Sequence, residues 1–480
     1  MRLSVPPVKG VDVKHRTGVI CQLMAPDRDI EGEWTRFVLP SVTGHMLVTV
    51  EGEVLYAFPK PPEPDQLPVD GTVLVGPILD GAVGHIDLKE SKWLVHSAIG
   101  GPDAGITRAR ESWLNGFRYV GDDEAGEGRI GLRRPQMGAI HAIHAHWSTS
   151  KDVATVVMPT GTGKTETMLA TLVSARCTRV LVLVPTDALR TQIAQKFFSM
   201  GILKDARATL LQPGVLRPVV GTLVKRPVTP EEVDEFFRQC NVVVTTSALA
   251  GRCSPEVQER MAEVCSHLFI DEAHHAEAAT WKRFKSHFKG QGLVLQFTAT
   301  PFREDGQPLD GKIIYVYPMR QAQSEGYFKP IRFSSVYAFN SARADLDIEE
   351  KVIEELHADA TGLHVAMARV STQVRATVVH AIYESLGEFN PVIIHSGLKE
   401  TEIDAARKKL ESGGSRIVIC VDMLGEGFDM PELKIAAFHD LRKSLAVTLQ
   451  LAGRFTRARE DLGEPVFIAN TADVNLKEEL

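Results

Sequence analysis

The middle of the chain alternates continuous apolar runs with stretches of helical periodicity. The apolar runs do not alternate with polar residues, which is typical of strands buried on both faces of a parallel sheet. They lie at residues 179–185, 241–246, 267–271 and 292–298. Helix candidates accompany them at residues 187–200, 230–238, 255–264 and 276–288. This order predicts an α/β fold with a doubly wound parallel sheet, which binds ligands at the carboxyl ends of its strands.

The C-terminal part of the chain repeats this alternation. Strand candidates lie at residues 362–369, 391–395, 416–421 and 433–438, and helix candidates lie at residues 372–386 and 399–412. We therefore expect two tandem lobes, at residues 131–328 and 329–480. The second lobe has no glycine-rich turn like the one described below for the first.

Residues 1–130 show a different pattern, in which short β-like segments are broken by Gly and Pro. Residues 45–58 and 71–76 are two such segments, and residues 121–131, rich in Gly, Asp and Glu, mark a boundary. We predict a small β-rich N-terminal domain. Its residues do not indicate a role. The domain could bind nucleic acid or a partner, or it could be an inert structural cover.

Composition indicates a globular, multidomain protein. The 480 residues suffice for about three domains with buried cores. A formal net charge of -7 argues against histone-like binding but leaves a local nucleic-acid groove open. The six cysteines form no C-x-x-C pair, which favours reduced thiols over a zinc ribbon or a disulfide framework. Because no signal-peptide core or membrane-length apolar run is present, we expect a soluble cytoplasmic protein without membrane contacts.

A glycine-rich turn, Met158–Thr165, lies between a short apolar run and a helix-competent stretch. Gly161 and Gly163 let backbone N–H groups face a phosphate, while Lys164 can reach the β and γ phosphates. The Thr165 hydroxyl can hold Mg²⁺. The turn therefore predicts binding of a nucleoside triphosphate, although Met158 replaces the usual small first residue. The alternative interpretation is a surface Gly/Thr turn.

An acidic pair, Asp271 and Glu272, follows the apolar run that ends near residue 270. We expect Asp271 to bind Mg²⁺ directly or through water, and Glu272 to orient and deprotonate the attacking water. The alternative is a solvated acidic helix start.

Six spaced motifs make residues 132–470 resemble the superfamily 2 helicases and translocases, in the DEAH-containing branch that includes restriction-enzyme motor subunits and phage-defence helicases. The motifs are Gln136, Gly161–Thr165, Asp271–His274, Thr298–Thr300, Val421–Asp429 and Gln450–Arg457. The resemblance implies that both lobes are RecA-like and that ATP with Mg²⁺ binds in the first.

The resemblance also implies roles for individual residues. Arg457 would be the arginine finger, with Arg454 close by, and both would stabilise the charge that develops on the γ phosphate. Cofactor contacts are implied for Gln136, Gly161, Thr162, Gly163, Lys164, Thr165, Gly427 and Asp429. Coupling of hydrolysis to the nucleic-acid path is implied for His274, Thr298, Thr300 and Gln450.

Nucleic-acid contacts are expected in loops that follow strands, because such motors hold phosphates through amides, hydroxyls and helix N-termini. The family pattern points to Thr186, Arg190, Thr246, Ser247, Ser396 and Gly397. Each of these loops could equally be an ordinary helix cap.

These features predict an ATP-dependent helicase or translocase acting on nucleic acid, with DNA favoured over RNA. Restriction, phage defence and repair are the expected settings, with a nuclease or sensor on a separate subunit. Two alternatives stay open: a nucleic-acid-stimulated clamp or remodeller without strand separation, and a P-loop ATPase or kinase with another substrate. Because the sequence stops at Leu480 in a helix-forming stretch, we expect the natural chain to continue.

Overall fold

The computed structural model describes most of the chain. The described residues are 2–49, 52–68, 70–76, 78–79, 85–86, 91–96, 105–275, 278–288, 290, 292–300, 308–327, 331–395, 397–421, 430, 432–440 and 463–472. The chain divides into two compact units, each assembled from separate stretches. The first comprises Met1–Ile140, Thr165–Phe269 and Ala278–Val294, and the second comprises His141–Lys164, Ile270–Glu277 and Leu295–Leu480.

The first unit begins with a six-stranded sheet, as the short β-like segments predict. Its strand order is β1 (Arg2–Val5), β4 (Arg28–Val38), β5 (Thr43–Thr49), β6 (Val54–Phe58), β7 (Thr72–Val75) and β10 (Lys92–Val95). Neighbouring strands are antiparallel except β6 and β7. Alternate side chains of β6 enter different cores, Leu55 on one side and Tyr56 and Phe58 on the other. Apolar residues thus stabilise both faces of the sheet.

The first unit also contains a sheet flanked by helices. Its strand order is β15 (His267–Ile270), β12 (Val180–Val184), β14 (Val242–Thr246), β13 (Val220–Leu223), β3 (Gly18–Ala25) and β2 (Val8–Lys14). Its helices include α1 (Ile106–Ser112), α4 (Asp187–Ser199), α5 (Pro230–Phe237), α6 (Ser247–Gly251), α7 (Pro255–Val264) and α8 (Ala278–His287). Strands β12, β14 and β13 are parallel and fully or almost fully buried, which confirms the predicted parallel α/β architecture.

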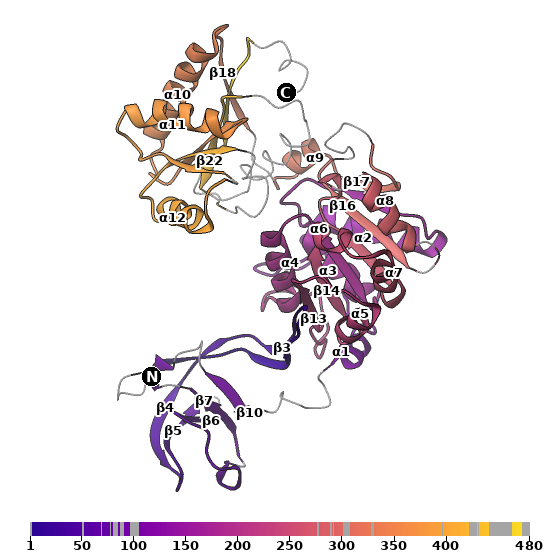
Figure 1. Cartoon of the computed structure of the whole chain (residues 1–480). Helices are drawn as coiled ribbons and strands as arrows, with labels where there is room; N and C mark the ends of the chain where they lie inside the picture. Colours follow the sequence, from indigo (N-terminus) through magenta and orange to yellow (C-terminus); the bar gives the residue numbers. More distant parts are fainter. Residues whose placement is uncertain are drawn as a thin grey trace. The chain divides into compact units, whose positions relative to one another are not determined.

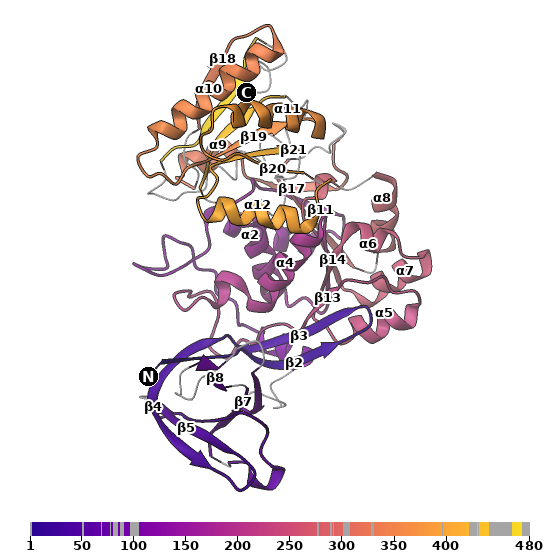
Figure 2. The ribbon, with the colours of Figure 1, turned by 60° about the vertical axis from the view of Figure 1, so that its left-hand side comes forward.

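An N-terminal hairpin extends this sheet, which the sequence pattern does not predict. Strand β3 pairs antiparallel with β13, and β2 pairs with β3 at the edge. Figure 2 shows the hairpin running beside β13 toward α5. The approach needs a glycine, because a Cβ at Gly18 would lie 2.0 Å from the Thr222 carbonyl oxygen. Residues 8–25 therefore belong to the helix-flanked sheet, although they precede the predicted boundary near residue 130.

The second unit holds three parallel strands near the phosphate loop and a separate six-stranded sheet. The three are β17 (Lys312–Val316), β11 (Ala154–Val157) and β16 (Leu293–Thr298), in that order. The second sheet has the order β18 (Arg332–Val336), β23 (Val466–Asn470), β22 (Leu433–Phe438), β19 (Val365–Val370), β21 (Ile417–Val421) and β20 (Val392–Ile394). All its neighbouring strands are parallel.

Helices cover both faces of the second sheet (Figure 1). Ala366 and Ala368 of β19 face α10 (Ser341–Ala358) and α11 (Gln373–Ser385), whereas Val365 and Met367 face α12 (Glu400–Glu411) and α9 (Met319–Ser324). The alternation follows from the two-residue period of a strand. It confirms the predicted second α/β lobe.

Two chemical expectations can be compared with the structure. All six cysteines lie in the described part of the chain, and none forms a disulfide. None of the helices among the residues described above has the length and apolar character that a membrane span requires.

The buried carboxyl of Glu349 on α10 predicts a pH effect on stability. Burial, aided by Glu350, raises the pKa of Glu349 to about 6, and its Oε1 atom has no hydrogen-bond partner. The folded state therefore holds this proton more tightly, so the stabilising contribution present below about pH 4.5 is lost as the pH rises through 6. Glu349→Gln should raise the free energy of unfolding by about 1 kcal/mol at pH 8. Urea unfolding at pH 8 and pH 4.5 checks this, and a gain that persists at the lower pH would contradict it.

Candidate functional site

The glycine-rich turn folds as a phosphate loop between β11 and α3 (Lys164–Ser174). Gly161 and Gly163 have φ angles of 91° and 95°, in the left-handed region that glycine tolerates. Met158 is fully buried, and its N–H donates to the Thr298 carbonyl at 2.9 Å. Met158 is therefore a strand-end core residue beneath the loop. A small residue is not required at this position.

The loop lysine meets the acidic pair in space, although 108 residues separate them in sequence. Lys164 Nζ donates to Glu272 Oε1 at 2.6 Å, and each residue is only 7% exposed. A buried ion pair costs desolvation that its attraction only partly repays, so it is weak evidence for a purely stabilising role. The pair brings into contact the ammonium that is predicted to bind phosphate and the carboxylate that is predicted to activate water.

The backbone of Glu272 is strained. Its φ of 47° lies in the left-handed region, which costs a residue with a Cβ about 1–3 kcal/mol. The Glu272 N–H donates to Asp271 Oδ1 at 3.0 Å, which helps to hold this turn after β15. Asp271 is 6% exposed. The turn separates the two carboxylates, so that Glu272 points to Lys164.

A hydrogen-bond chain connects this acidic turn to the end of β16. His274 Nδ1 lies 3.6 Å from Glu272 Oε2 and 3.0 Å from Thr298 Oγ1. The Thr298 hydroxyl donates to the Thr300 carbonyl at 2.7 Å, so its oxygen must accept from His274. The geometry therefore assigns the proton on Nδ1 of His274. These buried contacts join the Asp271–His274 and Thr298–Thr300 motifs into one network.

The other residues predicted to contact the nucleotide or to act in its hydrolysis lie partly within the described structure. Gln136 lies in the first turn of α2 (Arg134–Thr149), is 2% exposed, and accepts a hydrogen bond from the Arg133 N–H at 2.8 Å. Thr162 is buried and donates from its hydroxyl to the Pro159 carbonyl at 2.7 Å. Thr165 is partly exposed in the first turn of α3. Gly427, Asp429, Gln450, Arg454 and Arg457 lie outside the described residues.

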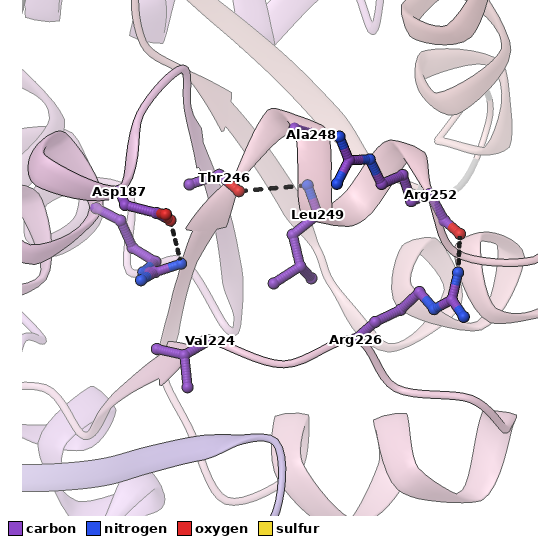
Figure 3. Close-up of a pocket in the computed structure, with 8 residues that line it drawn as sticks. Asp187, Val224, Arg226, Thr246, Ala248, Leu249 and Arg252 are labelled. Carbon is purple, nitrogen blue, oxygen red and sulfur yellow. Dashed lines mark hydrogen bonds and ion pairs between the residues drawn. The ribbon is translucent and has the colours of Figure 1, made fainter. Parts of the chain in front are cut away.

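A pocket of about 440 Å³ lies in the first unit, where three parallel strands end. Its lining comes from the last residue of β14 and from the segments that follow β12, β13 and β14. Figure 3 shows most of these residues around the pocket. The lining residues are Asp187, Arg190, Val224, Arg226, Thr246, Ala248, Leu249 and Arg252. Three arginines against one aspartate give the pocket a positive charge.

The pocket arginines are held in different ways. Arg190 Nη1 pairs with Asp187 at 2.6 Å, while its buried Nε has no hydrogen-bond partner. Arg226 Nη1 donates to the Arg252 carbonyl at 2.9 Å, as Figure 3 shows. The predicted list contains Arg190 but misses Arg226 and Arg252. The available signal was an arginine shortly after an apolar strand, which many surface loops also show.

The predicted threonines do act as helix caps. The Thr186 hydroxyl accepts from the Leu189 N–H, and that of Thr246 accepts from the Leu249 N–H, each at 3.3 Å. Because a hydroxyl that accepts still has a proton to donate, capping leaves both able to contact a phosphate. Ser247 is the first residue of α6.

The predicted loop in the second sheet is described only in part. The Gly397 N–H donates to His395 Nδ1 at 3.1 Å, whereas Ser396 lies outside the described residues.

Two family models match the chain in sequence. Residues 129–303 match "Type III restriction enzyme, res subunit", and residues 347–459 match "Helicase conserved C-terminal domain". Together they cover more than half of the chain, in the order of two helicase lobes. The chain belongs to the superfamily 2 helicases and translocases. Its relation to restriction-enzyme motors, predicted from the motifs, is confirmed.

Two curated relatives are distant and match only part of the chain. A 51.5 kDa protein of a Lactococcus phage is 26% identical over 210 residues, covering 40% of this helicase and 46% of the phage protein. The ATP-dependent RNA helicase DBP8 of Lodderomyces elongisporus is 22% identical over 315 residues, covering 61% and 66%. The chain thus spans about half the length of the first and less than two thirds of the second.

One solved structure matches nearly the whole fold. It is a fragment from Vibrio vulnificus assigned as the HsdR subunit of a type I restriction enzyme, with a TM-score of 0.53 and 16% identity. The match covers 99% of this helicase and 89% of that chain. At this identity the likeness concerns the fold alone.

Proposed function

We propose that this helicase hydrolyses ATP at the Lys164–Glu272 site and uses the hydrolysis to move along nucleic acid. The observation that carries the proposal is the buried contact path from Lys164 through Glu272 and His274 to Thr298. A path of this kind connects the position of the γ phosphate to a strand end outside the nucleotide loop. A simple P-loop kinase has no need for it.

In this proposal Lys164 binds the β and γ phosphates, which draws it away from Glu272. The freed carboxylate orients the attacking water and accepts its proton. Because His274 also faces Glu272, a change at the carboxylate alters the hydrogen bond to Thr298. Arg457, with Arg454 close by, stabilises the charge that develops on the γ phosphate. Gln136 is assigned to adenine, and Gly427 and Asp429 to further nucleotide contacts.

The donor set fits Mg²⁺. Magnesium prefers a few oxygen ligands from protein together with phosphate oxygens and water. Among the described residues, no cluster of three or more His, Cys, Asp or Glu side chains could hold a metal by itself. Asp271 and the Thr165 hydroxyl would hold the ion, which when bound neutralises phosphate charge.

We propose that the arginine pocket holds the phosphate backbone of the nucleic acid. Arg190, Arg226 and Arg252 supply charge there, and the hydroxyls of Thr186 and Thr246 supply donors. Ser247, Ser396 and Gly397 are proposed as further contacts. Recognition of phosphates rather than bases suits a protein that must step along many sequences.

DNA is the favoured track, since the chain is related to restriction-enzyme motors, and RNA is the rival. We also propose a cytoplasmic role in phage defence, restriction or repair, with a nuclease or sensor on a separate subunit.

The test is steady-state ATP hydrolysis with single- and double-stranded DNA and RNA. We expect at least one class to raise turnover about tenfold or more, as electrostatic binding at low salt should make evident. Turnover indifferent to all four would contradict the motor and favour the P-loop ATPase or kinase alternative, which phosphoryl transfer to small acceptors would then reveal.

Arg252→Ala should weaken nucleic-acid binding without impairing ATP binding. Loss of one phosphate contact is expected to raise the nucleic-acid concentration for half-maximal ATPase by about tenfold and to reduce the salt slope by about one unit. Arg238→Ala is the control, because Arg238 forms an exposed ion pair with Asp234 and does not line the pocket. Equal behaviour of the two variants would exclude Arg252 from the binding surface.

A further inference from the structure

The pocket residue Arg226 lies on a short loop, residues 224–228, between β13 and α5; we call it the Arg226 loop. Four of its five side chains provide little packing, since Val224, Lys225, Arg226 and Val228 are exposed, Val224 by 43% and Val228 by 58%; Pro227 is buried. Backbone hydrogen bonds at both ends hold it instead. The partners that accept those bonds position the loop backbone, and the Arg252 carbonyl, which accepts from Arg226 Nη1 at 2.9 Å, holds the guanidinium itself.

The N-terminal hairpin holds the first end of the loop. The N–H groups of Val224 and Lys225 both donate to the Thr17 carbonyl, each at 2.9 Å. Thr17 lies in the hairpin turn, is fully buried, and has its hydroxyl 2.9 Å from His15 Nδ1. The hairpin thus continues the ladder of β13 into the loop.

Glu232 of α5 holds the second end and also contacts the hairpin. Its Oε2 accepts from the Val228 N–H at 2.7 Å and pairs with the Arg16 guanidinium. The Val228 N–H lowers the pKa of Glu232, burial opposes this effect, and Arg16 adds to it. One carboxylate therefore connects the hairpin turn to the end of the loop.

The hairpin turn itself is fixed by several contacts. His15 and Gly18 exchange backbone hydrogen bonds, and the His15 ring packs edge-on against Phe236 at 5.5 Å. His15 Nε2 also lies 3.6 Å from Glu235. These contacts anchor the turn to α5 independently of the Arg226 loop, so the turn is a fixed support for that loop.

We propose that the N-terminal hairpin is a positioning element for nucleic-acid binding, in which Arg16, Thr17 and Glu232 hold the Arg226 loop so that Arg226 faces the arginine pocket. This inference rests on the proposed function of that pocket. It gives a role to residues 8–25, for which the sequence suggested none. A ligand bound to the six-stranded sheet that contains β1 could then change the affinity for nucleic acid through the hairpin.

The test compares Arg16→Ala and Glu232→Ala with two matched controls. Lys14→Ala removes the same charge from the hairpin, and Glu231→Ala removes the same charge from the first turn of α5; both control side chains are exposed. We measure the nucleic-acid concentration for half-maximal ATPase, the ATP KM and the ATPase rate without nucleic acid. The two test variants should raise the nucleic-acid concentration for half-maximal ATPase about three- to tenfold. The ATP KM and the ATPase rate without nucleic acid should stay unchanged.

The same four substitutions are then made in an Arg226→Ala background. Because Arg16 and Glu232 act through Arg226, their effect should disappear there, whereas a general loss of stability would persist. Urea unfolding of every variant identifies any that is poorly folded. Test variants that match their controls, or an effect of the same size without Arg226, would overturn the inference.

Different results would contradict the proposed function and the positioning role. Wild-type ATPase that no nucleic acid stimulates would overturn the proposed function and this inference together. Normal wild-type stimulation with no effect of Arg16→Ala or Glu232→Ala would overturn only the positioning role.

Discussion

Replacing Glu272 with glutamine is expected to lower ATP turnover by about 10²–10⁴-fold, the usual contribution of a general base. The substitution keeps the shape of the side chain but removes the carboxylate that accepts a proton from water. ATP affinity should stay the same or rise, because Lys164 would no longer be held by a buried carboxylate at 2.6 Å. Single-turnover hydrolysis and equilibrium nucleotide binding measure the two effects separately.

Glu349→Gln is the matched control for this variant. Glu349 and Glu272 are both 7% exposed, but Glu349 lies on α10 and takes no part in the proposed chemistry. Its turnover should equal that of the wild type. If Glu272→Gln also retained full turnover, Glu272 would not be the base.

Arg457→Ala should lower ATP turnover further, by about 10³–10⁵-fold, the range found for arginines that stabilise a transferring phosphoryl group. This expectation comes from the sixth motif, Gln450–Arg457, which lies outside the described residues. ATP binding should change much less than turnover, because the charge that the arginine stabilises develops in the transition state. Steady-state kinetics at saturating ATP and nucleic acid check the prediction.

Arg459→Ala provides the comparison within the same basic run. It removes an equal charge two residues beyond the motif. A loss of similar size in both variants would indicate a general electrostatic effect and would remove Arg457 from its proposed role.

The elements of the nucleotide site could be predicted because each is a short continuous motif whose residues determine the local structure. Gly161, Gly163 and Lys164 predict a phosphate loop by spacing alone, and an uninterrupted apolar run before Asp271 predicts a buried strand. The motifs do not show which of their residues contact one another in the folded protein. The Lys164–Glu272 ion pair and the proton position on His274 depend on strand order, which the sequence pattern does not specify.

Other elements were missed for identifiable reasons. Strand β13 contains Gly221, which looks like a break, yet a Cβ there would lie 2.7 Å from Cys240 Sγ and Phe236. The glycine is needed for close packing of α5. Helix α10 had a readable signal, because Ala344, Ile348, Val352 and Leu356 recur every four residues and are buried.

For the hairpin at residues 8–25, the sequence predicts the secondary structure but not the sheet that the hairpin joins. The partner is decided by Gly18, whose missing side chain allows contact with Thr222, and by Arg16, which meets Glu232 more than 200 residues away. Such pairings depend on tertiary packing, so the arginine pocket and its support emerge only from the structure.

The central claim is that ATP cleavage moves this protein along nucleic acid, and displacement of a roadblock tests it most directly. Streptavidin is bound to a biotin at one end of the nucleic acid that best stimulates ATPase, and its release is timed with and without ATP. We expect release that requires ATP, stops in Glu272→Gln, and is faster from one strand end than from the other. Vigorous nucleic-acid-stimulated hydrolysis with release at the spontaneous rate would contradict movement and would favour the clamp.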